Sequence, residues 1–328
     1  MSVVVPGTLG QFADLVNESI QDIFVKRADF PSQMEKYFNV TDTNSYYSKD
    51  SSVTGTTGAH RIGDNASVQY DAPLQGFDKT YTQVKFGNGL EISDHLWRYG
   101  IEFRKITGLV ETLTDGMRDK IEEDAADMLN NSYSTSYTDA DSGTVSTAGG
   151  DVAAYFTASH TREDGGTAWN NIVYDGTTYN MDFEYDALKA ARKTAAAIVG
   201  PRGQKMDFEP DMLIAKYGSS VQDRYEELQG AFTRDRIPGG NENDGIAKVG
   251  LPKAIFLKHL DNDAYYFLTD SSKKGDTYGL QWKWSMRPKM LEPEIVYDTQ
   301  LYKRQILAFY DRGANDMRSW LGSTGANA

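Results

Sequence analysis

One long run of apolar residues at helical spacing constrains the fold of this chain more than any other feature of its sequence. The run steps by three or four residues through Leu96, Tyr99, Phe103, Ile106, Val110, Leu113, Met117, Ile121, Ala125 and Met128. The pattern predicts one amphipathic helix over residues 94–130, roughly 50 Å long. The sequence holds no second heptad helix to pair with it in a coiled coil. We therefore expect a single long helix laid across a sheet.

A second constraint is the composition of residues 40–78, which are rich in Ser, Thr, Gly, Asn and Asp and poor in aliphatic residues. Such a segment cannot form a core of its own, so we expect an extended arm, a long hairpin or a loop. Its scattered aromatic residues are Tyr46, Tyr47, Tyr70 and Phe77. Because tyrosine is favoured on half-wet contact surfaces, they favour a segment that a partner orders.

The remaining pattern mixes helices and strands without regular alternation. Expected helices cover residues 8–27, 185–200 and 219–230, and expected strands cover 80–86, 152–176, 211–218, 254–269 and 279–311. Gly87-Asn88-Gly89 reads as a turn. In the first helix, Phe12 and Ile20 belong to an apolar stripe that packs either on the chain's own core or on a neighbouring subunit. The order predicts an α+β fold and not the βαβ alternation of a nucleotide-binding sheet.

Composition excludes several classes of function. The 328 residues carry 34 basic and 47 acidic side chains, a net charge of −13, which argues against a broad basic face for nucleic acid. Cysteine is absent, which excludes disulfides, thiolate metal sites and cysteine nucleophiles. The first residues resemble no signal peptide, and no apolar stretch is long enough to span a membrane, so we expect no membrane contact.

Sites for chemistry are few. The four histidines do not have metal-ligand spacing, and neither a phosphate-binding loop nor a nucleophile elbow is present, so we expect no cofactor and no metal. Asp139, Asp141 and Gly143 begin like a calcium loop, but the pattern then breaks. His160 with Asp164 is the one conceivable acid–base pair, and a loop histidine near turn acids is the simpler interpretation.

Two basic stretches also have a structural and a functional interpretation. Trp282, Lys283 and Trp284 interleave aromatic and basic residues as base-stacking surfaces do, but in a strand the two Trp share one face, as in a core. Arg234 and Arg236 begin a polar loop, where they either pair with a neighbour or lie at a solvated tip.

The order of these parts resembles the major capsid proteins of tailed bacteriophages, the Hong Kong 97 fold. The resemblance rests on a polar extended segment, the stretch YTQVKFGNGLEISDHLWRYG, and the lone long helix that follows it. The block YFTASHTREDGGTAWNNIV is similar to a stretch of Mu-like major head subunits. PDMLIAKYGSSVQDRYEELQG resembles the strand and helix of the family's apical domain, and LYKRQILAFYDRGANDMRSW resembles its final long strand.

The resemblance implies a division into parts. Residues 1–43 would be the N-terminal arm, 44–90 the extended loop over a neighbouring subunit, and 91–181 a peripheral domain with the spine helix. Residues 182–285 would be an α/β apical domain, and 286–328 the return to the peripheral domain. Candidate contacts between subunits are Phe12, Ile20, Tyr46, Tyr47, Arg61, Tyr70, Phe77, Arg234 and Arg236. Some members cross-link a Lys to an Asn, but no such pair is singled out in this sequence.

The function implied is that of a structural protein and not an enzyme. Its copies would assemble through pentamers and hexamers into an icosahedral shell that encloses double-stranded phage DNA without binding it specifically. A portal and a maturation protease are expected partners. A separate scaffolding protein is also expected, since no long coiled-coil scaffolding segment precedes the arm. Assembly would take place in the bacterial host cytoplasm and end in the virion. The alternatives are an encapsulin-like shell around a cargo enzyme, another virion part, or a hydrolase that uses His160 and Asp164.

Overall fold

The structure is a computed structural model of the chain. It describes residues 21–22, 24–25, 32–56, 58–64, 67–68, 70–93, 103–141, 143–233, 250–274, 278–296 and 301–325. The helices are η1 (Met34–Lys36), α3 (Phe103–Asn130), α4 (Tyr185–Ala197), α5 (Ser220–Thr233) and η3 (Ser271–Lys273). The strands of the first half are β1 (Asn39–Asp42), β2 (Tyr47–Val53), β3 (Gln75–Thr82), β4 (Val84–Ser93), β5 (Ser136–Thr138) and β6 (Thr144–Ser146). Those of the second half are β7 (Met212–Lys216), β8 (Lys253–Leu257), β9 (Tyr266–Thr269), β10 (Leu280–Met290), β11 (Glu294–Val296), β12 (Leu301–Ala314) and β13 (Trp320–Ser323).

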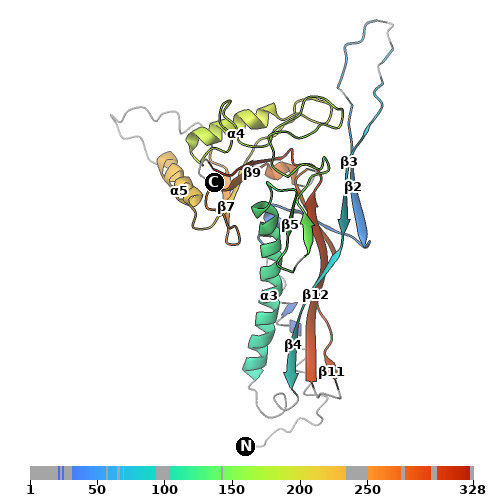
Figure 1. Ribbon diagram of the computed structural model, residues 1–328, viewed down its shortest axis with the longest axis vertical. Coiled ribbons are helices and arrows are strands. Elements are labelled where there is room, and N and C mark those ends of the chain that lie inside the picture. Colours follow the sequence, from blue (N-terminus) through green and yellow to red (C-terminus); the bar gives the residue numbers. More distant parts are fainter. Residues whose placement is uncertain are drawn as a thin grey trace, which may run out of the picture.

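The molecule has an elongated body, a broader end and a projecting hairpin (Figure 1). In the body, α3 runs alongside β4, β12 and β11, and the unit that contains α4, α5, β7 and β9 lies across one end of it. The hairpin of β2 and β3 leaves the body near that end and points away from it. This mixture of few helices and several separate sheets confirms the expected α+β class.

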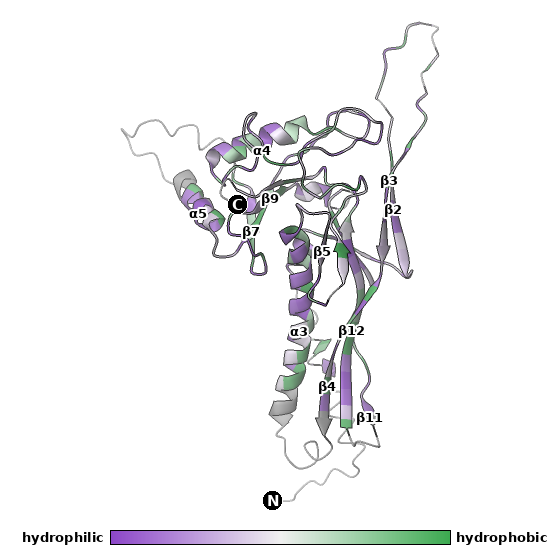
Figure 2. Cartoon of the chain, viewed as in Figure 1, coloured by the Kyte–Doolittle hydropathy of each residue, from purple (hydrophilic) through white to green (hydrophobic). Residues whose placement is uncertain are grey.

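The long helix packs on the larger sheet as the periodic pattern predicts. Strand β12 forms the centre of this sheet, with β10, β11 and β4 all pairing with it in antiparallel fashion and β1 added beyond β10. The described part of α3 alternates hydrophilic and hydrophobic residues along its length (Figure 2). Its buried positions include Val110, Met117 and Ile121 from the predicted stripe. The predicted residues 94–102 lie outside the described residues.

The expected turn at Gly87-Asn88-Gly89 is wrong. These residues continue strand β4, where Gly87 pairs with Leu307 and Gly89 with Gln305 of β12. The chain instead changes partner at Gln83, between β3 and β4. A long partner strand supplies ladder hydrogen bonds that override the local preference of glycine for a turn. A Cβ on Gly87 would lie 2.5 Å from the Leu307 side chain, so close packing is one reason for glycine there.

The broader end has its own sheet and its own core. Strand β7 lies between β8, which is parallel to it, and β9, which is antiparallel and also pairs with β13. Helix α4 contributes Ala187, Leu188 and Ala191 to this second core, which also contains Leu213 of β7. Helix α4, strand β7 and helix α5 confirm the elements predicted for residues 185–230.

The start of helix α5 and the segment 152–176 show two different kinds of local structure. The Ser219 hydroxyl accepts a hydrogen bond from the Gln222 N–H at 3.3 Å, and the Gln222 side chain accepts one from the Gly218 N–H at 2.8 Å. These two bonds cap the start of α5, with the return bond one residue earlier than in a standard capping box. The strands expected in residues 152–176 are wrong, because this segment forms only isolated bridges, such as that between His160 and Trp169. Among the described residues, no helix combines the length and the apolar character needed to cross a membrane.

Candidate assembly surface

The projecting hairpin exposes apolar side chains that the subunit itself does not cover. Its strands β2 and β3 pair from Tyr47 opposite Thr82 to Val53 opposite Gln75, and residues 54–74 connect them. Four exposed residues of this connection are called here the apolar loop surface: Ile62, Val68, Tyr70 and Leu74. Tyr70 is 89% exposed. Large apolar side chains that remain in water on a long projection mark a contact surface, because burying them in a partner is favourable.

The structure places the predicted contact residues that it describes at three positions along the hairpin. Tyr70 and the exposed Arg61 lie in the connection at the end of the hairpin. Tyr46 and Tyr47 lie at the start of β2, 59% and 64% exposed, with their rings in an edge-on contact at 4.6 Å. Phe77, in β3, is half-buried. The other candidates, Phe12, Ile20, Arg234 and Arg236, lie outside the described residues.

The hairpin is fastened to the body by a nearly buried cation that lies between Trp282 and Trp284 in strand β10. Lys283 of β10 is 7% exposed, and its ammonium pairs with the Asp50 carboxylate of β2. The same nitrogen hydrogen-bonds the Ser48 hydroxyl at 3.1 Å and lies 4.4 Å from the ring centroid of Tyr81 in β3. Both strands of the hairpin therefore contact one side chain of the larger sheet.

A second set of hydrogen bonds fixes strand β3 further along. Asn315 donates its side-chain N–H to the Phe77 carbonyl at 3.2 Å, and Thr82 N–H donates to the Asp311 carboxylate at 2.6 Å. Lys79 donates to the Ala148 carbonyl at 2.7 Å. Burial lowers the pKa of Lys79 below its ordinary value, and nearby Asp311 only partly opposes this. These contacts give the hairpin a defined root.

A buried charge cluster joins α3 to β12 beneath this root. Arg312 and Asp124 are both buried, with guanidinium and carboxylate 3.1 Å apart. Tyr310 donates its hydroxyl to the same Asp124 oxygen at 2.6 Å, and Arg312 also reaches Asp139 at 3.3 Å. Burial raises the pKa of Asp124 above its ordinary value, against the opposing effect of Arg312. Lys120 lies 3.2 Å from Asp124 and 3.1 Å from Asp139, so each of these two carboxylates has two cations close to it.

The same cluster includes the one group of carboxylates, among the described residues, with a spacing suited to a metal ion. Oxygens of Asp124, Asp127 and Asp139 lie within 4.8 Å of one another. Lys120 and Arg312 already bind two of these carboxylates. A metal ion would have to displace or tolerate these cations, so the chemistry of the cluster is that of an internal ion pair that links helix to strand.

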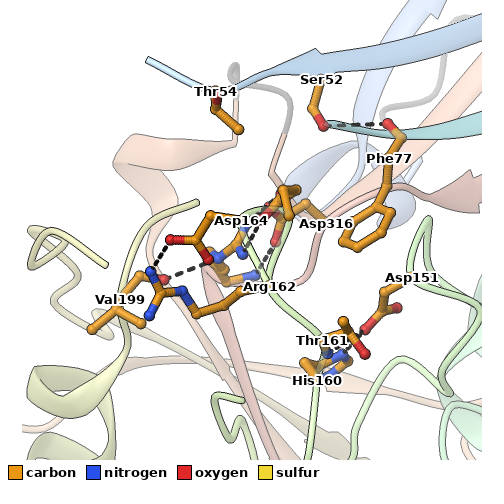
Figure 3. A network of polar contacts seen from close by, with 12 residues as sticks. Ser52, Thr54, Phe77, Asp151, His160, Thr161, Arg162, Asp164, Val199 and Asp316 are labelled. Atoms are coloured by element: carbon orange, nitrogen blue, oxygen red, sulfur yellow. Dashed lines mark hydrogen bonds and ion pairs between the residues drawn. The ribbon is translucent and has the colours of Figure 1, made fainter. Parts of the chain in front are cut away.

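The structure does not bring His160 and Asp164 together as an acid–base pair (Figure 3). His160 Nδ1 lies 2.8 Å from Asp151 and Nε2 lies 3.1 Å from Asn171 Oδ1, with the imidazole stacked on Trp169 at 4.2 Å. Asp164 instead pairs with Arg162. Burial alone would raise the pKa of Asp151, but the hydrogen bond and charge of His160 outweigh it and hold that pKa below its ordinary value. Because His160 is 2% exposed, this arrangement is a structural lock on the loop and not an open catalytic site.

Comparisons with known proteins give a family from one family model and a fold from solved structures. A family model described as "Phage capsid protein" matches residues 77–282, more than half of the chain. The capsid structure of the cyanophage P-SCSP1u is similar with a TM-score of 0.53 at 12% identity, covering 91% of this chain and 89% of that one. The capsid of a native GTA particle is similar with a TM-score of 0.52 at 10% identity, covering 89% and 90%. No curated protein matches the sequence. At these identities the structures establish the fold alone, which is the Hong Kong 97 fold expected from the order of elements.

Proposed function

Since this chain belongs to the phage capsid protein family, as the major capsid protein that forms the head shell, we propose that its projecting hairpin binds a neighbouring subunit in that shell. The observation that carries the proposal is the apolar loop surface, whose Tyr70 is 89% exposed on the single subunit. Each buried Å² of apolar surface contributes about 25 cal/mol, so a neighbour that covers this surface gains a favourable contact.

Repetition makes such contacts sufficient for a shell. Each subunit offers one hairpin and receives another, so every added copy closes several contacts at once, and contacts that are weak alone add up. Closed symmetry requires that the same surfaces meet around each axis. In this proposal, pentamers and hexamers are the intermediate rings, and an icosahedral shell is the product. The N-terminal arm (1–43) and extended loop (44–90) would bridge subunits, while the peripheral (91–181, 286–328) and apical (182–285) domains would form the wall.

The proposed partners follow from the same role. We propose a scaffolding protein, a portal and a maturation protease as further partners, with assembly in the bacterial host cytoplasm and the virion as the final location. The net charge of −13 suits a shell that encloses double-stranded DNA without specific binding, because like charge leaves the duplex free to move.

The alternative functions receive less support. A hydrolase that uses His160 and Asp164 is not favoured, because these side chains bind different partners and His160 is buried. An encapsulin-like cargo shell has the same fold, but the matching family is that of phage capsid proteins.

Limited proteolysis tests the hairpin contact. Arg61 is an exposed trypsin site in the loop, and Arg224 on α5, with a side chain 56% exposed, is a reference site far from it in the sequence. We expect trypsin to cut after Arg61 rapidly in the free subunit and much more slowly in assembled particles. Equal cleavage rates at Arg61 in free subunits and in particles would refute a hairpin covered by its neighbour. Cleavage after Arg224 reports whether assembly hinders the protease in general.

A further inference from the structure

One arginine of the broader end reaches across to the neck of the projecting hairpin. Arg202 lies in the turn between α4 and β7, and its side chain is 10% exposed. Its guanidinium donates to the Ala72 carbonyl and, through Nε, to the Thr54 hydroxyl at 3.3 Å. A third nitrogen lies 4.0 Å from the Asp71 carboxylate. Arg202 thus contacts both sides of the loop connection, just beyond the ends of β2 and β3.

The neck is a ring of hydrogen bonds between Thr54 and Leu74, and Arg202 binds to it from outside. Thr54 N–H donates to the Leu74 carbonyl at 2.9 Å, and Leu74 N–H donates to the Thr54 hydroxyl at the same distance. The hydroxyl also donates to the Leu74 carbonyl at 3.1 Å. Thr54 is 1% exposed, although it lies at the base of an exposed loop. The guanidinium therefore binds at the hydrogen-bonded crossing between the paired strands and the loop.

The turn that carries Arg202 is held firmly from behind. Gly200 N–H donates to the Gln204 carbonyl at 2.7 Å, and the Val199 carbonyl accepts from the buried Arg318 side chain at 3.0 Å. Gly203 has φ +79°, and a Cβ there would lie 2.6 Å from the Arg162 guanidinium. Because the backbone of this turn has little freedom to move, the Arg202 side chain has a fixed position relative to the α4 unit. The groups that it binds are therefore held in a fixed position relative to that unit as well.

We propose that Arg202 is a positioning residue that sets the direction in which the loop leaves the subunit, by joining the neck of the hairpin to the unit that contains α4. The hairpin root is fixed by Lys283 and Asn315, but these contacts lie on the body side of the neck. Arg202 contacts the neck from the other side, from the unit that contains α4. The assembly role of this positioning rests on the function proposed above, in which the loop reaches a neighbouring subunit.

The absence of cysteine makes a direct distance measurement simple. Cysteines introduced by Ser67→Cys in the loop and Ala196→Cys on α4, both at exposed positions, accept spin labels for pulsed distance measurement in the full-length free subunit. The distribution is compared for the wild-type background, Arg202→Ala and Lys205→Ala. Lys205→Ala is the matched control, because it removes an exposed cation from the same turn. If Arg202→Ala fails to fold, Arg202→Lys, which keeps the charge and loses the fork of donors, replaces it.

We expect one narrow distance peak in the wild-type and Lys205→Ala backgrounds, and loss of that peak to a broad distribution when Arg202 is replaced. A distribution in Arg202→Ala that superimposes on the wild type overturns the inference, and so does equal broadening in Lys205→Ala. Shell formation is scored separately. If the wild-type chain forms no shells while the peak still depends on Arg202, the positioning role holds and the proposed assembly function fails.

Discussion

Replacing Arg312 by methionine tests how the long helix is joined to the central strand of the larger sheet. The Arg312 side chain is 3% exposed and lies 3.1 Å from the fully buried Asp124 carboxylate. Methionine keeps an unbranched apolar stem and removes the charge. The variant leaves Asp124 in the core with Lys120 as its remaining cation, at 3.2 Å.

The expected loss is large. At 3.1 Å, a pair of unit charges in a medium of effective dielectric constant about 20 attracts by about 5 kcal/mol. Removing one partner of a buried pair costs about 3–5 kcal/mol of unfolding free energy, because the other charge stays buried. A second variant, Asp124→Asn with Arg312→Met, leaves Lys120 and Asp139 paired and keeps an acceptor for the Tyr310 hydroxyl. We expect the double variant to regain at least about half of the loss.

Urea unfolding of the free subunit, followed by tryptophan fluorescence, measures these differences, since Trp282 and Trp284 are buried in the same sheet. Arg192→Met, at an exposed position of α4, controls for the loss of an arginine anywhere on the subunit. The reasoning is refuted if Arg312→Met loses less than about 1 kcal/mol. It is equally refuted if the double variant is less stable than the single one.

Three further predictions follow from the other contacts. Asp151→Asn lowers the unfolding free energy by about 1–3 kcal/mol at neutral pH. Because the pKa of Asp151 in the folded state lies below the ordinary 3.8, this loss of stability is present above pH 3.8 and disappears as the pH falls through the folded-state pKa. Urea titrations at several pH values check this, and a loss of stability that grows on acidification contradicts it. Lys283→Met frees the Asp50 carboxylate and speeds amide exchange in β2, as hydrogen-exchange mass spectrometry would record, whereas unchanged exchange there means that the other contacts suffice. Serine at all four positions of the apolar loop surface keeps the subunit folded and lowers the yield of particles in sedimentation at least about tenfold, since a loss of about 1.4 kcal/mol per contact is a tenfold change in its equilibrium constant. Val152→Ser, at another exposed position, is the control. A normal yield of particles from the loop variant counts against the hairpin contact.

The elements that the sequence predicts well are those with a strong local pattern. The apolar stripe that ends at Met128 is long enough that one face of a helix is its simplest explanation. Gly200 and Pro201 predict the end of helix α4, which the structure places at Ala197. Local sequence patterns do not predict strand β4 correctly. Its Gly87 and Gly89 look like turn residues, and only the pairing with β12, more than two hundred residues later, makes them strand.

The contacts between buried charged side chains cannot be predicted from the sequence, because their partners lie far apart along the chain. Tyr310 and Asp124 are 186 residues apart in the sequence, and no spacing rule links them. The sequence offers His160 and Asp164 as a conceivable acid–base pair beside the simpler interpretation of a loop histidine near turn acids. In the structure Asp164 binds Arg162, and Asp151 binds the imidazole. Arg202 lies in a turn without any motif, so only its contacts with Thr54 and Ala72 identify it.

The sequence predicts that residues 40–78 form a contact segment, but not which structure this segment adopts. Residues 40–78 are too poor in aliphatic residues to form a core, so the sequence predicts an arm, hairpin or loop whose tyrosines contact a partner. The structure shows Tyr46, Tyr47 and Tyr70 exposed, and their contact with a partner stays a prediction. The sequence offers no sign that this segment is a hairpin fastened at Lys283 and directed by a distant turn, because those contacts depend on tertiary packing.

Electron microscopy of the full chain, expressed alone and together with a candidate scaffolding protein, tests the central claim most directly. Sedimentation velocity on the same samples measures the size of whatever forms. The account predicts closed shells, or five- and six-membered rings that convert to shells, in at least one of the two conditions. A chain that stays a compact monomer at high concentration in both conditions would contradict it.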